Sequence, residues 1–179
     1  MTGKIMVMSI LLTSVIAGAT MYYLQVYGFY QRVNVEQSKG ISLVNLSTQE
    51  PEKIQVANFQ GIDANSSPIR FRACFEVNEH IDLLKEKYVM LNAATPRNAP
   101  MWFNCFNAGR IGEDLSRGSA TAFLGSKNFE YGIDRYIVVY PDGRGYAWNE
   151  INDCGEKLYD GSTKDLSLIH ISEPTRQDS

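Results

Sequence analysis

Aromatic and arginine side chains concentrate on a predicted hairpin between residues 133 and 151, where they could bind a ligand or a partner. Its turn is Tyr140-Pro141-Asp142-Gly143, a sequence typical of tight turns. A three-residue loop with a glycine bulge would place Tyr140 opposite Arg144. One face would then carry Tyr136, Tyr140, Arg144, Tyr146 and Trp148. Aromatic rings provide contact area at small entropic cost, and arginine provides directional hydrogen bonds.

Two alternatives to this binding face stay open at the level of sequence. A two-residue turn would instead place Trp148 beside Ile137, because a register shift moves side chains to the other face. The rings could also cover the sheet beneath a helix or loop, and we favour this second arrangement over an exposed binding face.

Three further arginines are candidates for binding a carboxylate or phosphate. Arg70 and Arg72 are predicted to project from the same side of one strand, although pairing with Glu76 or Glu79 is the favoured alternative. A ligand-binding or enzymatic cluster would combine Arg70, Arg72 and Arg135 with nearby carboxylates such as Asp134 or Asp142.

Most other classes of chemistry find no support in the sequence. The chain has only two His and three Cys, and its motifs match neither a metal site nor a nucleotide loop, so we predict no metal and no cofactor. It has 17 basic and 20 acidic side chains, a balance that argues against nucleic-acid binding. No catalytic residue is assigned, and we lean toward a non-enzymatic protein.

Cys74 and Cys105 lie in similar aromatic settings and are predicted to form a disulfide in an exported domain. The alternative is a pair of buried free thiols. Cys154 then has no partner, which is unusual for an exported protein.

An apolar stretch at residues 5–24 has the length needed to cross a bilayer core of about 30 Å. The aromatic residues that follow suit the headgroup region, and they are Tyr22, Tyr23, Tyr27, Phe29 and Tyr30. We favour an uncleaved anchor over a signal peptide cleaved near Ala17-Gly18-Ala19. Lys4 before the span favours a cytoplasmic amino terminus.

The chain therefore divides into an anchor at residues 1–30, a linker at 31–40 and one domain at 41–165. Strands are expected at residues 41–46, 54–59, 69–75 and 119–124, in addition to the hairpin. One helix is expected after Asn78 and another from Asn107 to Gly118. This order predicts an α+β domain with a mainly antiparallel sheet.

Several long stretches resemble an uncharacterised family of small alphaproteobacterial membrane-anchored proteins. The resemblance covers about residues 1–161, and it is carried by residues 19–27, 67–75, 131–135 and 140–148. Members are sometimes labelled histidine kinases, but this chain lacks room for the two domains such an activity requires. Residues 166–179 resemble translated sequencing-adapter readthrough and are expected to be a non-native tail.

Together these features predict a single-pass protein of the bacterial inner membrane with a periplasmic domain. It would contact the bilayer through residues 5–24 and, as an accessory or assembly factor, another envelope protein. The alternative is a periplasmic small-ligand binder or enzyme that uses the arginine and carboxylate cluster.

Overall fold

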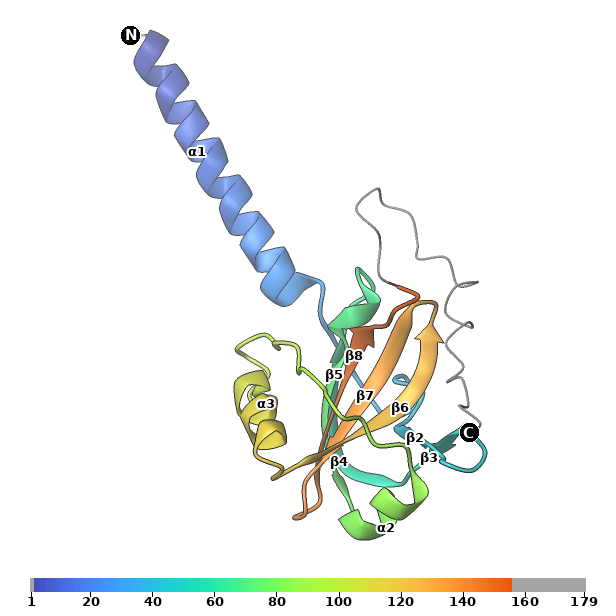
Figure 1. Ribbon diagram of the computed structural model, residues 1–179. Helices are drawn as coiled ribbons and strands as arrows, with labels where there is room; N and C mark the ends of the chain where they lie inside the picture. Colours follow the sequence, from blue (N-terminus) through green and yellow to red (C-terminus); the bar gives the residue numbers. More distant parts are fainter. Residues whose placement is uncertain (1, 156–179) are drawn as a thin grey trace, which may run out of the picture.

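A long apolar helix stands apart from a folded domain in the computed structural model, which describes residues 2–155 (Figure 1). The helix α1 spans Thr2–Tyr23 and continues as a π-helical turn, Leu24–Gly28. By length and composition, Gly3–Gly28 could cross a membrane, and no part of the domain buries it. The predicted tail at 166–179 lies outside the described residues.

The domain is built on a six-stranded antiparallel sheet with strand order β1-β4-β5-β8-β7-β6. The strands of this sheet are β1 Gln31–Val33, β4 Val56–Asp63, β5 Arg72–Val77, β6 Thr121–Glu130, β7 Ile133–Val139 and β8 Arg144–Ile151. A small second sheet pairs β2 Ser42–Val44 with β3 Pro51–Lys53. The two short helices are α2 Ile81–Lys87 and α3 Ala108–Ser116. The predicted α+β class is confirmed.

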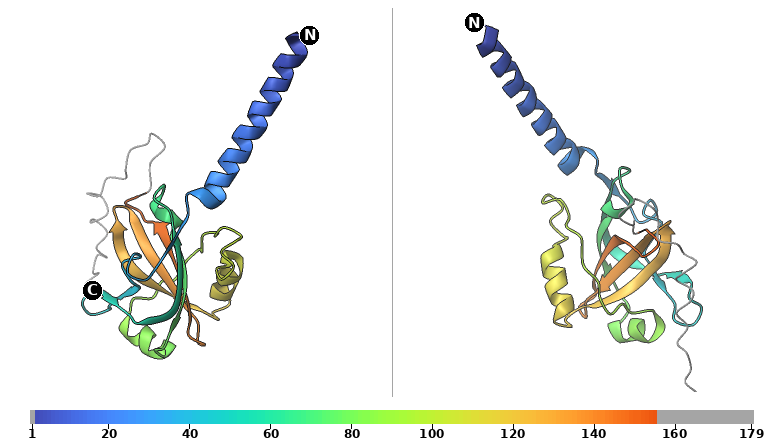
Figure 2. Two further views of the ribbon diagram at one scale, coloured as in Figure 1. Left: turned by 180° about the vertical axis from the view of Figure 1, so that it is seen from behind. Right: turned by 45° about the horizontal axis from the view of Figure 1, so that its top comes forward.

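Both faces of the large sheet are covered, so the domain has two hydrophobic cores. On one face, α2 and β2 contribute Ile81, Leu84 and Leu43 to a core with Phe75 and Ile137. On the other face, α3 and the segment before it pack on the sheet, and this second core includes Phe103, Phe106, Ile111, Val138 and Trp148. Figure 2 shows α3 and α2 as separate elements beside the sheet.

The central strand β5 differs from its prediction in two respects. It begins at Arg72 rather than residue 69, because Pro68–Arg70 forms a 3₁₀ turn. The sequence alternation predicts a half-buried strand, but Arg72 through Phe75 are all buried. The reason is that β5 lies in the middle of a sheet that is covered on both faces.

The elements with strong local signals form as predicted. The Asn107 side chain caps α3 by accepting a hydrogen bond from the backbone of Arg110 (3.0 Å), and Gly118 has a left-handed φ of 73°. The hairpin has the three-residue loop, since the Tyr140 N–H donates to the Arg144 carbonyl (2.9 Å). Tyr136 consequently pairs with Trp148, which is the predicted register.

The position of β1 shows where the apolar helix joins the sheet. Residues 31–33 pair with Asp63, Ile62 and Gly61 at the end of β4, inside the segment that the sequence predicts as a linker. The sheet therefore begins only three residues after the π-helical turn ends at Gly28. The hairpin turn between β7 and β8 lies at the opposite end of the domain from α1 (Figure 1).

Candidate functional site

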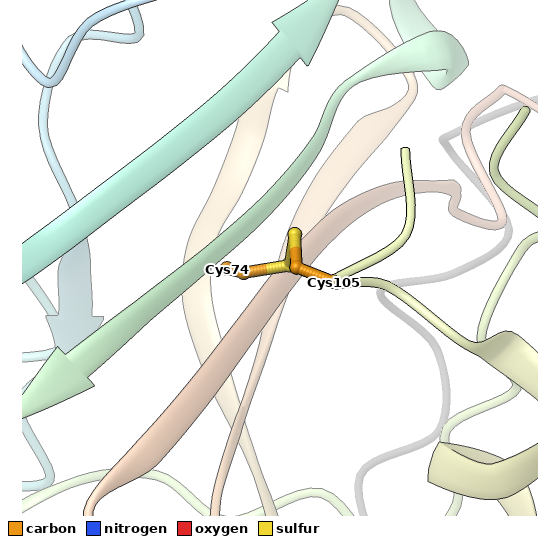
Figure 3. Close-up of a disulfide and its surroundings, with 2 residues drawn as sticks. All are labelled: Cys74 and Cys105. Atoms are coloured by element: carbon orange, nitrogen blue, oxygen red, sulfur yellow. A yellow bond between two sulfur atoms is a disulfide. The ribbon is translucent and has the colours of Figure 1, made fainter. Parts of the chain in front are cut away.

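The predicted disulfide between Cys74 and Cys105 is present (Figure 3). It joins β5 to the segment that precedes α3, with the two Cα atoms 6.3 Å apart and a sequence separation of 31. Cys154 is a free thiol in the turn after β8. The bridge fixes an otherwise irregular segment against the central strand of the sheet.

The hairpin rings are buried under α3 and its preceding segment. Trp148 has 0% exposure, and the Phe106 ring meets the rings of Trp148 and Tyr146 edge-on at 6.4 and 5.9 Å. The expected binding face is therefore not an exposed patch, because α3 and the segment before it cover these rings. The alternative that we favour from the sequence, in which the rings cover the sheet, is the arrangement observed.

Tyr140 connects the same ring cluster to α3. Its hydroxyl donates to Asp114 Oδ2 at 2.8 Å. Burial and this hydrogen bond both raise the pKa of Tyr140. Arg144, at the edge of the face, lies over the Tyr140 ring and donates from Nε to Asp142 Oδ2 (2.7 Å). Tyr140 and Arg144 thus each form a hydrogen bond to a carboxylate of the same domain.

Arg72 is 4% exposed and serves as an internal clamp. Its Nε donates to the carbonyl oxygens of Arg97 (2.9 Å) and Asn98 (3.2 Å), and its Nη1 donates to those of Ile69 and Phe71. Burial lowers the pKa of Arg72 to about 10. The favoured pairing of Arg72 with Glu76 or Glu79 does not form, because the guanidinium is surrounded by backbone carbonyls.

Arg70 lies apart from Arg72, although the sequence places the two on one face of a strand. The 3₁₀ turn directs the Arg70 guanidinium over the ring of Tyr30, with its central carbon 5.5 Å from the ring centre. Glu76, one of the expected carboxylate partners, instead accepts a hydrogen bond from Asn58 (2.7 Å). The two arginines therefore do not form a joint anion site.

Arg135 lies on the opposite face of the sheet from Arg72 and is 2% exposed. Its guanidinium is stacked between the rings of Phe71 and Phe129, 4.0 and 3.9 Å from their centres. It donates to Asn149 Oδ1 (3.0 Å) and to the Ser38 carbonyl (2.7 Å). Burial lowers its pKa to about 10.

The expected arginine and carboxylate cluster does not assemble. Asp134 faces away from Arg135, since neighbouring residues of a strand point to opposite faces, and it accepts from Asn128 and Asn152. Asp142 lies in the distal turn, where it binds Arg144. Sheet geometry therefore separates residues that are close in sequence.

A surface hollow of about 590 Å³ lies between residues 93–98 and the hairpin, bordered by Tyr136 and Glu150. Arg97 forms an ion pair with Glu150 in its wall, and hydrogen bonding to this carboxylate raises the pKa of Arg97. Burial raises the pKa of Tyr136. Of these residues, only Tyr136 is a candidate from the sequence. Arg97 was missed because residues 93–98 follow no helical or strand periodicity.

The second feature missed from sequence is Trp102. It joins the tyrosines at the end of the apolar helix, which the sequence does identify, in an aromatic cluster of Tyr23, Tyr27, Tyr30 and Trp102. The Trp102 indole N–H donates to the Val26 carbonyl at 2.7 Å. Its ring stacks on Tyr27 at 6.4 Å and meets Tyr30 edge-on at 6.1 Å, while Tyr23 stacks on Tyr27. The sequence separation of 76 between Val26 and Trp102 explains why no local pattern reveals this contact.

Among residues 2–155, no group of three His, Cys, Asp or Glu side chains is arranged to hold a metal ion. A family model described as a family of unknown function, DUF6446, matches residues 41–167. No curated protein and no solved structure matches the chain.

Proposed function

Because this chain belongs to the family of unknown function DUF6446, we propose its role from its own structure. We propose that it is a single-span protein of a bacterial inner membrane, with its amino terminus in the cytoplasm and its domain in the periplasm. There the domain contacts another envelope protein as an accessory or assembly factor. Catalysis is not part of this proposal.

The combination of an uncovered apolar helix and a disulfide carries the proposal. An apolar surface as long as Gly3–Gly28 is stable in lipid, and the domain covers it only at its end, through Trp102. Disulfides persist in oxidising compartments and are rare in the cytosol. The Cys74–Cys105 bridge therefore supports placing the domain on the translocated side of the membrane.

The positions of the candidate polar groups argue against a catalytic role for them. Arg72 holds backbone carbonyls, Arg135 is stacked between rings, and Tyr140 is bonded to Asp114. Catalytic groups need access to a substrate, whereas each of these is occupied inside the domain.

A second candidate function is the binding of a small ligand in the hollow beside Arg97, Glu150 and Tyr136. The observation in its favour is the size of the hollow, about 590 Å³, together with an ion pair in its wall. Pockets of this size accommodate small molecules. The hollow is the candidate ligand site in place of the arginine and carboxylate cluster expected from the sequence, because that cluster does not assemble.

The proposed membrane insertion and periplasmic location are tested by fractionation, protease protection and thiol labelling of the native chain. We expect the protein to stay in membranes after carbonate extraction, and its domain to be digested by protease added to spheroplasts. Cys74 and Cys105 should resist labelling after unfolding unless a reductant is added, while Cys154 serves as the internal labelling control. A carbonate-soluble protein with all three thiols reactive would overturn the proposal.

The two functions are separated by crosslinking and by ligand binding. Crosslinking in cells followed by purification of the full chain should recover one specific envelope protein at a reproducible ratio. For the alternative, a small-molecule screen by thermal shift should give saturable binding that Glu150→Gln abolishes and Glu113→Gln, on exposed α3, retains. Saturable binding without a protein partner would favour the second function over the first.

A further inference from the structure

The segment before α3 lies directly beside the end of the apolar helix. Figures 1 and 2 show it next to the last turn of this helix from several directions. The Trp102 N–H binds the Val26 carbonyl, within the π-helical turn that ends the candidate span. Indole rings with a hydrogen-bonded N–H are characteristic of the membrane interface. If Gly3–Gly28 spans the bilayer, Trp102 lies at the level of the lipid headgroups.

Met101, the neighbour of Trp102, projects from this segment into solvent. Its exposure of 85% is the highest among the large hydrophobic residues with exposed side chains in residues 2–155. A flexible thioether side chain adapts well to irregular apolar surroundings. Met101 therefore presents an uncovered apolar side chain on the same loop that holds Trp102 against the end of the helix.

Two arginines without carboxylate partners lie near the same place. Arg32 borders a hollow that Trp102 and Cys105 also line, and Arg70 lies over Tyr30 within the aromatic cluster. Neither arginine forms an ion pair within residues 2–155. Positive charge at this depth suits the phosphate groups of lipids, especially those of anionic lipids.

The segment is held firmly at both ends. At residues 97 and 98 the Arg72 guanidinium binds two carbonyl oxygens, and at Cys105 the disulfide joins the segment to β5. A surface that is already ordered loses little conformational entropy when it binds. The position of Met101 is thus fixed by the sheet rather than by the bilayer.

We infer that residues 98–105 form a bilayer-docking loop, in which Met101 enters the interfacial layer while the exposed Arg32 faces lipid phosphates. The inference rests on the anchor in the proposed function and adds a second contact between the domain and the membrane. Docking of this loop would fix the domain against the lipid surface instead of leaving it free on a tether.

Site-specific photocrosslinking of the full chain tests this docking. A benzophenone amino acid is placed at position 101, 83 or 15 in vesicles of phosphatidylcholine and phosphatidylglycerol with an alkyne-tagged lipid. Leu83 is the matched control, because it is 60% exposed on α2 at a distance from the helix end. Val15 is in the middle of α1 and reports insertion of the span.

We expect lipid adducts at positions 15 and 101, with position 101 exceeding position 83 several-fold. Adducts at 15 but equal yields at 101 and 83 would overturn the docking loop and leave the anchor intact. Absence of adducts at 15 would overturn the anchor, and the inference with it. A cooperative thermal unfolding transition in each variant shows that the domain is folded.

Tryptophan fluorescence gives a second measurement without a bulky probe. The chain has two tryptophans, and Trp148 is fully buried, so brominated lipids should quench only Trp102. We expect quenching in the full chain with bromine close to the headgroup, and its loss in Trp102→Phe. Unquenched fluorescence in vesicle-bound protein would contradict the inference.

Discussion

At the scale of single residues, buried arginine is what most distinguishes this domain. Arg72 and Arg135 lie on opposite faces of the sheet, and each is held by groups from segments distant in sequence. Arginine suits both positions because its planar guanidinium can donate several hydrogen bonds and stack on rings. Each buried arginine therefore acts as a structural connector.

Replacing Arg72 tests its role as a clamp. Lysine keeps the charge but cannot bind four carbonyl oxygens in the same plane, so Arg72→Lys should reduce the free energy of unfolding by about 2 to 3 kcal/mol. The measurement is urea unfolding of the full chain in nanodiscs. Arg144→Lys, at a partly exposed surface pair, is the control and should change stability by less than about 0.5 kcal/mol. Equal losses of stability in Arg72→Lys and Arg144→Lys would contradict the role of Arg72 as a clamp.

Tyr140 should make stability depend on pH in alkaline solution. Its pKa in the folded chain is raised above its ordinary value of 10.0, so the unfolded state loses this proton first as the pH rises. The stabilisation by Tyr140 is thus complete below about pH 10 and declines above it.

We expect Tyr140→Phe to be less stable than wild type by about 1 to 2 kcal/mol at pH 8, because a hydrogen bond to a carboxylate is lost. The difference should shrink as the pH rises above about 10. Arg72 and Arg135, whose pKa values are lowered to about 10 by burial, titrate in the same pH range. Because both proteins contain these arginines, their contribution cancels in the difference between the two free energies of unfolding. A stability difference between the two proteins that grows with pH would contradict a raised pKa of Tyr140 in the folded chain.

Residue types alone could not predict how the candidate site is arranged. The alternation around Arg70 and Arg72 suggests one strand face, but the 3₁₀ turn after Ser67 separates them. Trp102 has no sequence signal of its function, because its partner Val26 belongs to another element. Such contacts depend on tertiary packing and not on local pattern.

At the scale of elements, the disulfide and the close packing of strands hold the second core together. Reducing Cys74–Cys105 should cost about 3 to 4 kcal/mol, since the closed loop of 31 residues becomes unrestricted in the unfolded chain. Urea unfolding with and without reductant measures this loss. The double variant Cys74→Ser/Cys105→Ser should reproduce it in the absence of reductant, whereas Cys154→Ser should not.

The pairing of β5 with β8 depends on a glycine opposite an aromatic ring. Gly145 pairs with Phe75, and a Cβ at this position would overlap the phenyl ring. Gly145→Ala should therefore destabilise the domain by about 1 to 3 kcal/mol. Gly109→Ala, where an added Cβ would meet only Asn107 Oδ1 at an ordinary 3.5 Å, should be neutral or slightly stabilising. Thermal unfolding of both variants checks the contrast.

Elements with strong local signals could be predicted from the sequence, and irregular ones could not. The turn Tyr140-Pro141-Asp142-Gly143 determines the hairpin register, and the Asn107 cap and Gly118 delimit α3. Residues 92–107 carry no periodicity, yet they form the wall of one hollow and the contact with the anchor. Their conformation is fixed by Arg72 and by the disulfide.

At the scale of the whole molecule, Trp102 links the anchor to the domain. We expect Trp102→Ala to broaden the distance distribution between spin labels at positions 21 and 83, because the hydrogen bond to Val26 and two ring contacts are lost. Double electron–electron resonance in nanodiscs, with the Cys154→Ser background, measures this distribution. Tyr131→Ala, at an exposed ring outside the cluster, is the control and should leave it unchanged.

If the domain is exported as proposed, the pairing of β5 with β8 bears on the order of folding events. If transfer starts from the residues next to the anchor, Cys105 crosses the membrane well before residues 144–148, which complete the middle of the sheet. The sulfur bridge can consequently close while β5 still lacks its neighbour on one side. Early oxidation would then restrict the nascent chain and shorten the search for the final strand, which makes oxidant supply in the receiving compartment a determinant of folding yield.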